Sequence, residues 1–139
     1  MVDADFADWL AICNLKARYC RLLDTKDWDG WKALFTPDCV IDTTASGGSV
    51  TRDRDSFVAS VSQSLAEAKT AHQVHSPEIT IDGDEARAVW AMQDRVVWGE
   101  RGLTGYGHYH ERYRRTADGW QIAEQTLTRL HMDMDGMGN

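Results

Sequence analysis

Several features that would place a protein in a class at once are scarce in this sequence. Its 139 residues include two prolines and three cysteines, and 15 basic against 22 acidic residues give a formal net charge of −7. A nucleic-acid partner would need a basic face, so this balance argues against one. No apolar run approaches the roughly 18 residues of a membrane span, and the start MVDADFADWL lacks the pattern of a signal peptide.

The few cysteines also limit the possibilities. Cys13, Cys20 and Cys39 cannot all pair, and no Cys-x-x-Cys is present. We therefore expect reduced thiols in the core of a cytoplasmic protein. The length predicts a single domain over residues 1–139. Six tryptophans in a chain that is 42% hydrophobic favour either a strongly aromatic core or an apolar pocket.

The period of the apolar residues changes along the chain. Spacings of three and four predict helices over 6–23, 27–35 and 55–68, with Asp27 capping the second helix and Asp55 or Ser56 the third. A short strand is expected at 39–43, followed by a loop at ASGGS. Alternation then predicts strands at 74–81, 85–98, 106–115 and 120–130, with turns at DGD, ERGLTG and TADG. Residues 131–139 show no periodicity and are expected to form a flexible tail.

This order of elements predicts an α+β fold. Three helices would gather over one face of a curved antiparallel sheet, which gives a cone-shaped α+β barrel. The inside of such a cone is apolar and suits a small-molecule ligand.

Asp94 is a carboxylate within an apolar strand pattern. It shares its parity with Ala86, Ala88, Trp90, Met92, Val96 and Trp98, so its side chain should lie on the apolar face. Burying an unpaired carboxylate is costly. Asp94 should therefore line a pocket and orient a histidine or handle a proton, unless a bulge turns it outward or it pairs with Arg87, Arg95 or another base.

Two further candidates lie near the end of the first predicted helix. Asp24 falls where the helix macrodipole disfavours an anion, and it could equally be a solvated acid that begins the DTKDWD turn. Tyr19 lies five residues earlier. The two side chains can converge if the helix ends near Leu23, although a tyrosine here could also simply pack in the core.

The histidines form two groups. His72 and His75 flank the start of a strand, and their different parity means that only one should face a pocket, where it could act as a general base. Either could also be a structural histidine. His108 and His110 share a face in a His-x-His pattern, which forms metal sites in some proteins. Such a site also requires an acidic residue at the position of Arg114, so we expect no metal.

The sequence contains no motif for nucleotide binding or for acyl-enzyme chemistry. There is no glycine-rich phosphate loop, no Gly-x-Ser-x-Gly elbow and no Cys-His signature. The remaining tyrosine, histidines and carboxylates suit proton transfer on an apolar substrate without a cofactor.

Three segments resemble a known family. They are YCRLLDTKDWDGWKALFTPDCVID, HQVHSPEITIDGDEARAVWAMQD and YGHYHERYRRTADGWQIAEQTLTRL, and together they span most of residues 6–130. Their order is similar to that of SnoaL-like domains in the nuclear-transport-factor-2-like superfamily. The closest likeness is to cofactor-free dehydratases of the scytalone dehydratase and bile-acid 7α-dehydratase type.

The resemblance implies roles for four residues. His72 and Asp24 match the histidine base and its aspartate in those enzymes, while Tyr19 and Asp94 match a helix tyrosine and a strand aspartate. Departures are Leu23, where scytalone dehydratase has a tyrosine, and Thr43 near a second tyrosine position, so scytalone itself is not the expected substrate. The dehydrochlorinase of the superfamily has a lysine where Tyr19 stands, which argues against its chemistry here.

The prediction is therefore a lyase of dehydratase type acting on a small hydrophobic cyclic or aromatic, polyketide or steroid-like substrate. His72, Asp24, Tyr19 and Asp94 would carry the chemistry. Substrate contacts are expected from Trp90, Met92, Trp98, His75 and His108.

Alternatives remain at this point. The same groups could serve an isomerase, a polyketide cyclase or a formaldehyde-releasing retro-aldol lyase. The domain could also be a non-catalytic binding module, or the matched residues could surround an inactive pocket. The resemblance further implies a homodimer or homotrimer.

Overall fold

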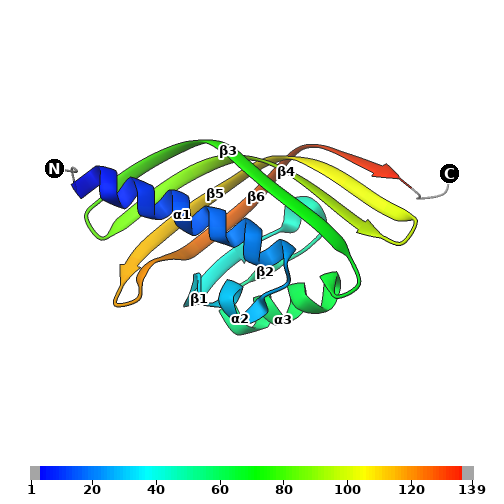
Figure 1. The fold of residues 1–139 in the computed structure, drawn as a ribbon, viewed down its shortest axis with the longest axis horizontal. Coiled ribbons are helices and arrows are strands. Elements are labelled where there is room, and N and C mark those ends of the chain that lie inside the picture. The colour runs from blue at the N-terminus through cyan, green and yellow to red at the C-terminus, as the bar shows by residue number, and fades with distance from the viewer. Residues whose placement is uncertain (1–3, 136–139) are drawn as a thin grey trace.

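The computed structural model describes residues 4–135 and shows an open, strongly curved sheet with helices along one side and across its opening (Figure 1). The helices are α1 (Ala4–Asp24), α2 (Trp28–Lys32) and α3 (Arg54–Leu65), with a 3₁₀ turn η1 (Thr44–Ser46). The strands are β1 (Phe35–Asp42), β2 (Val50–Thr51), β3 (Lys69–Asp82), β4 (Glu85–Trp98), β5 (Arg101–Thr116) and β6 (Gly119–Asp135).

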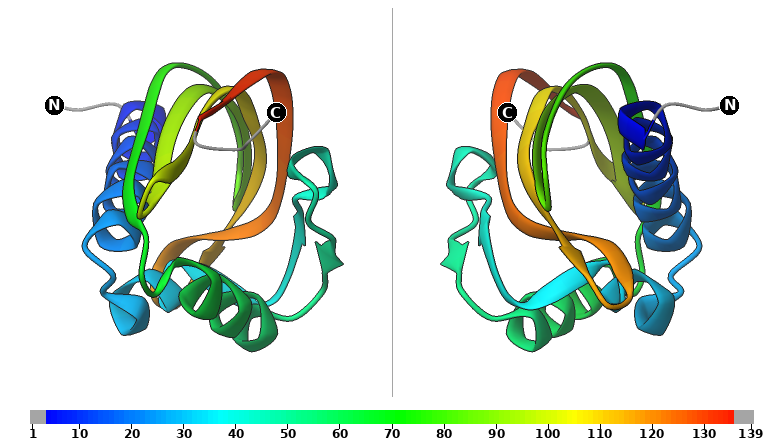
Figure 2. Two further views of the ribbon diagram at one scale, coloured as in Figure 1. Left: turned by 90° about the vertical axis from the view of Figure 1, so that its right-hand side faces the viewer. Right: turned by 90° about the vertical axis from the view of Figure 1, so that its left-hand side faces the viewer.

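The sheet is mixed rather than wholly antiparallel. Its strand order is β2-β1-β6-β5-β4-β3, and β1 runs parallel to β6 while every other neighbouring pair is antiparallel. Figure 2 shows β3 to β6 arching over, with α2 and α3 across the open side and α1 beside β3. The expected α+β class, with three helices on a curved sheet, is confirmed.

Several strands are longer than their apolar patterns predicted. β1 begins at Phe35, β3 at Lys69 and β5 at Arg101, so Gly105 lies inside a strand and not in the turn expected at ERGLTG. Residues 131–135 continue β6 and pair with β5, where a flexible tail was expected. The rest of that tail lies outside the described residues. Long hydrogen-bonded ladders therefore extend beyond the apolar core.

The caps of the short helices are aspartates. Asp27 accepts a hydrogen bond from the backbone N–H of Gly30 at 3.0 Å, as its position predicted. The cap of α3 is Asp53, which accepts from the backbone N–H of Ser56 at 2.8 Å, and not Asp55 or Ser56 as expected. Both carboxylates satisfy N–H groups that the first turn of a helix leaves free.

An aromatic cluster joins the helices to the sheet. The ring of Trp31 lies 5.0 Å from that of Phe35, 5.5 Å from that of Phe57 and 5.5 Å from that of Tyr19, centroid to centroid. Trp31 and Phe35 are almost completely buried. Since these rings come from α1, α2, β1 and α3, this cluster holds the helices against the open side of the sheet.

Replacing Phe35 with alanine should lower the free energy of unfolding by about 3–5 kcal/mol, because the cavity it leaves is surrounded by rigid rings. Urea unfolding measures this loss. Leu130→Ala is the control, since Leu130 is 74% exposed and its loss should be within about 0.5 kcal/mol. Equal losses in the two variants would contradict the assignment of the core.

Candidate active site

A cavity of about 120 Å³ lies between the helices and the inner face of the sheet. Apolar side chains from all three helices and β6 form much of its wall: Leu23, Trp31, Phe57, Val61, Leu65 and Leu127. Its polar lining consists of Tyr19, Thr43, His72, Asp94, Tyr109 and Gln125. Such an apolar space with a few converging polar groups is typical of a small-molecule site.

Asp24 holds His72 in a fixed orientation. Its carboxylate accepts three hydrogen bonds, from His72 Nδ1 at 2.7 Å, the His72 backbone N–H at 2.8 Å and Thr70 Oγ1 at 2.8 Å. A carboxylate only accepts, so Nδ1 carries a hydrogen, and in the neutral ring Nε2 keeps its lone pair. α1 ends at Asp24 and β3 begins just before His72, which is why two residues far apart in sequence meet.

Asp94 lies on the inner face of β4, as the strand parity predicted, and is 5% exposed. It is the cross-strand neighbour of His72, and its Oδ2 lies 3.9 Å from His72 Nε2. Its direct partner is Arg129, which donates from Nη1 at 2.8 Å and from Nη2 at 3.1 Å. The carboxylate is therefore both paired and held close to the ring nitrogen that keeps its lone pair.

Sequence patterns did not identify Arg129, because it lies near the end of a strand where alternation had faded. A second contact fixes it, from its Nε to Ser46 Oγ at 2.8 Å, so η1 is part of the site and not merely a loop. Gly105, opposite Asp94 in the register, makes room for the pair. A Cβ there would lie 2.4 Å from Asp94 Oδ1 and 2.2 Å from Arg129 Nη1.

A second polar network reaches the cavity through Tyr19. The Tyr19 hydroxyl donates to Gln125 Oε1 at 3.2 Å, and Gln125 Nε2 donates to Glu111 Oε2 at 2.5 Å. Lys16 Nζ also donates to Glu111, at 2.7 Å, and both side chains are completely buried. Lys16 and Glu111 were not predicted as part of the site, although Glu111 has the inward parity of Tyr109.

The two cavity tyrosines remain neutral hydroxyls. Burial raises the pKa of Tyr19 well above its usual range, and the Glu111 carboxylate adds to the shift. Burial likewise raises the pKa of Tyr109, with a smaller contribution from Tyr19. Trp31 adds another polar group, since its Nε1 is buried and has no hydrogen-bond partner among residues 4–135. This unpaired N–H is a cost to the fold.

The expected apolar wall differs from the observed one. Trp90 and Met92 are buried on the face that carries Asp94, but they pack in the core and do not line the cavity. Trp90 Nε1 donates to the Tyr113 hydroxyl at 2.9 Å. Trp98 is 37% exposed at the end of β4, and its Nε1 donates to the Ser64 carbonyl at 3.3 Å. Parity alone could not show how far the helices cover the strand.

Two other histidines proposed as substrate contacts also lie away from the cavity. His75 is exposed beside a bulge in β3 and contacts Ser76 Oγ at 3.1 Å. His108 does not line the cavity, because its neighbour Tyr109 has the inward parity on β5. Within the described residues, no three His, Cys, Asp or Glu side chains come together as a metal site. His72 is thus the histidine at the cavity.

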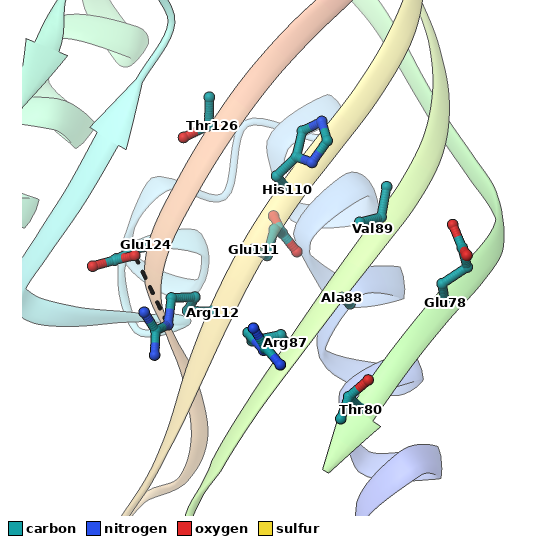
Figure 3. A pocket seen from close by; sticks show the side chains of 10 residues that line it. All are labelled: Glu78, Thr80, Arg87, Ala88, Val89, His110, Glu111, Arg112, Glu124 and Thr126. Carbon is teal, nitrogen blue, oxygen red and sulfur yellow. Dashed lines mark ion pairs between the residues drawn. The ribbon is translucent and has the colours of Figure 1, made fainter. Parts of the chain in front are cut away.

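A larger hollow of about 430 Å³ lies on the sheet and is lined by charged residues from four strands (Figure 3). His110 and Arg112 extend into it from β5, and Arg112 Nε lies 4.0 Å from Glu124 Oε2. Both of these charged side chains are more than half exposed, so water screens them. The cavity at His72, with its largely apolar wall, is the better setting for proton transfer.

The chain belongs to the SnoaL-like domain family, whose model matches residues 4–126. No helix among the described residues is long and apolar enough to cross a membrane. The structure thus places the Asp24–His72 pair inside a domain of this family.

Relatives and solved structures agree with this assignment. The "Probable cyclase FGR4" of Gibberella zeae is 28% identical over 130 residues, which cover 84% of this chain and 87% of that protein. A candidate aromatic ring hydroxylase of Novosphingobium aromaticivorans has a TM-score of 0.87 at 26% identity, covering 93% of this chain and 94% of its own. A candidate scytalone dehydratase of the same organism has a TM-score of 0.87 at 18% identity, with coverage of 100% and 94%, and shows the shared fold.

Arg129→Met should lower the free energy of unfolding by about 3–5 kcal/mol, because it leaves the Asp94 carboxylate buried without a partner. Adding Asp94→Asn should restore part of that loss, since the remaining group carries no charge. Urea unfolding of the single and double variants measures both effects.

The control for this series is Arg95→Met. Arg95 also pairs with an aspartate, Asp135, but both side chains are about half exposed. Its loss should be below about 1 kcal/mol. If the double variant were less stable than Arg129→Met, the unpaired Asp94 carboxylate would not be the cause of the stability loss in Arg129→Met.

Proposed function

We propose that this protein is a cofactor-independent lyase that eliminates water from a small cyclic substrate. The observation that carries the proposal is the Asp24–His72 pair, which leaves Nε2 as a basic nitrogen at an apolar cavity. His72 Nε2 takes a proton from a carbon next to an activating group. The electrons of that C–H bond form a double bond as the neighbouring C–O bond breaks, and the hydroxyl leaves as water after taking up a proton.

Asp24 and Asp94 have different roles in this scheme. Asp24 keeps His72 in the tautomer with a basic Nε2 and stabilises the imidazolium formed by proton transfer. Asp94, 3.9 Å from Nε2, lies beyond hydrogen-bond distance but close enough to stabilise the same cation. Arg129 occupies both Asp94 oxygens. The imidazolium is therefore the group that returns a proton to the leaving oxygen.

The oxygen atoms of the substrate would meet the hydroxyls of Tyr19 and Tyr109, since both residues line the cavity. The hydrogen of Tyr19 is engaged by Gln125, but at 3.2 Å this is a long hydrogen bond between oxygens and can be exchanged for one to a ligand. These donors would bind a carbonyl or hydroxyl and favour negative charge that develops on it.

The volume of the cavity narrows the substrate class. An apolar protein cavity of about 150 Å³ is large enough to bind benzene. The cavity here is somewhat smaller, about 120 Å³, so a single oxygenated ring is the largest group that we expect it to hold. A steroid or a multi-ring polyketide would have to extend out of it.

An isomerase or cyclase is the second candidate. One relative is the "Probable cyclase FGR4", which matches most of this chain. The same base and oxygen-binding groups could form an enolate and return the proton or close a ring, without loss of water. A retro-aldol loss of formaldehyde would use them as well, so the product decides among these reactions.

His72→Ala should lower kcat by at least about 10²-fold, the usual contribution of a general base. His75→Ala is the matched control: it removes another histidine of β3, one that is exposed and does not line the cavity, and should leave kcat unchanged. Activity is measured on a panel of single-ring hydroxylated ketones and alcohols. Equal activity of wild type and His72→Ala on a turned-over compound would rule out this base.

Mass spectrometry of the products tests the reaction type in the same assay. A product lighter by one water, absent with His72→Ala, supports the dehydratase. Loss of formaldehyde would indicate a retro-aldol lyase instead of a dehydratase. A product of unchanged mass that still depends on His72 would indicate an isomerase. Ligand binding without any turnover would leave a binding module.

A further inference from the structure

Lys16 and Glu111 form an ion pair in the middle of the core. The side chains are completely buried, and Nζ lies 2.7 Å from Oε2. Glu111 also accepts from the Tyr113 hydroxyl at 2.5 Å and from Gln125 Nε2 at 2.5 Å. Every contact of this carboxylate is thus made inside the protein.

Stability alone does not explain such a pair. Removing two charges from water is costly, and apolar residues of similar size often replace a buried ion pair without loss of stability. The fold already has an aromatic cluster and long strand ladders. Because this buried pair contacts residues that line the cavity, we ask how it orients them.

The contacts of the pair lead directly to that wall. Glu111 accepts only, so it must face the amide nitrogen of Gln125, which turns Gln125 Oε1 toward Tyr19. Lys16 Nζ lies 3.5 Å from the centroid of the Tyr19 ring and 3.7 Å from that of Tyr109. Gln125, Tyr19 and Tyr109 all line the cavity.

We propose that Lys16 and Glu111 are positioning residues for an oxygen-binding group formed by Tyr19, Tyr109 and Gln125. Glu111 fixes the direction of the Gln125 amide, and the Lys16 ammonium holds both phenol rings by cation–π contact. The substrate oxygen then meets hydroxyls of fixed position. This inference rests on the proposed function, because it assigns the oxygen of the single-ring substrate to this part of the same cavity.

The test uses binding and needs no turnover. Phenol and toluene serve as probes, since they have nearly the same shape and only phenol has an oxygen. Their affinities are measured by calorimetry for wild type, Tyr19→Phe, the double variant Lys16→Met/Glu111→Gln, and the combination of all three. Both members of the pair are replaced together so that no buried charge is left alone.

The double variant should bind phenol about tenfold more weakly, as expected for the loss of one well-placed hydrogen bond. Tyr19→Phe should have a similar effect. The combined variant should lose less affinity than the two separate effects added together, because the pair acts in part through Tyr19. Toluene affinity should change by less than about twofold throughout. Lys32→Met, which removes an exposed ion pair with Asp55, is the control and should change neither affinity.

Other results would overturn the proposal. Equal losses for phenol and toluene, or additive losses with Tyr19→Phe, would mean that the pair only supports the fold. Wild-type phenol affinity in the double variant would also reject it. If the wild type bound neither probe, the proposed single-ring substrate class would be rejected. If the double variant does not fold, Gln125→Leu breaks the same link, and additivity with Tyr19→Phe would again reject positioning.

Discussion

The hydrogen-bonded contact between Asp24 and the first residues of β3 is the constraint on which the site depends. One carboxylate at the last residue of α1 accepts from Thr70, from the backbone of His72 and from its ring. It therefore ties the first residues of β3 to the end of α1 and fixes the orientation of the His72 ring. The register of β3 with β4 then brings Asp94 beside that ring. The contacts of Asp24 thus both hold α1 against β3 and orient the His72 ring.

Charges inside this domain are tolerated because each is matched. Arg129 pairs with Asp94 by two hydrogen bonds, and Lys16 pairs with Glu111. Of these four residues, Asp94 lines the cavity. Buried pairs contribute little net stability. Their value is that they fix polar groups around an apolar space where water cannot rearrange them, and such preorganisation is what a charge-developing reaction requires.

The sequence predicted the class of fold and the inward face of Asp94, because strand parity and helix spacing are local properties. It could not predict the parallel pairing of β1 with β6 or the length of β5. Gly105 shows why: a glycine usually indicates a turn, yet here it gives room to an ion pair between β4 and β6. Parity showed that only one of His72 and His75 faces a pocket, but the choice of His72 needed its pairing with Asp94 across the strands.

The remaining surprises share one physical cause. Arg129, Lys16 and Glu111 are charged residues, a type that is usually exposed. Each is largely or completely buried here beside a partner from a distant segment. Trp98 is the opposite case, an apolar residue left half-covered where the helices end. Periodicity reports which face of an element a side chain occupies. It does not report what lies opposite that face, and in this domain the opposite element decides whether a position belongs to the core, the cavity or the solvent.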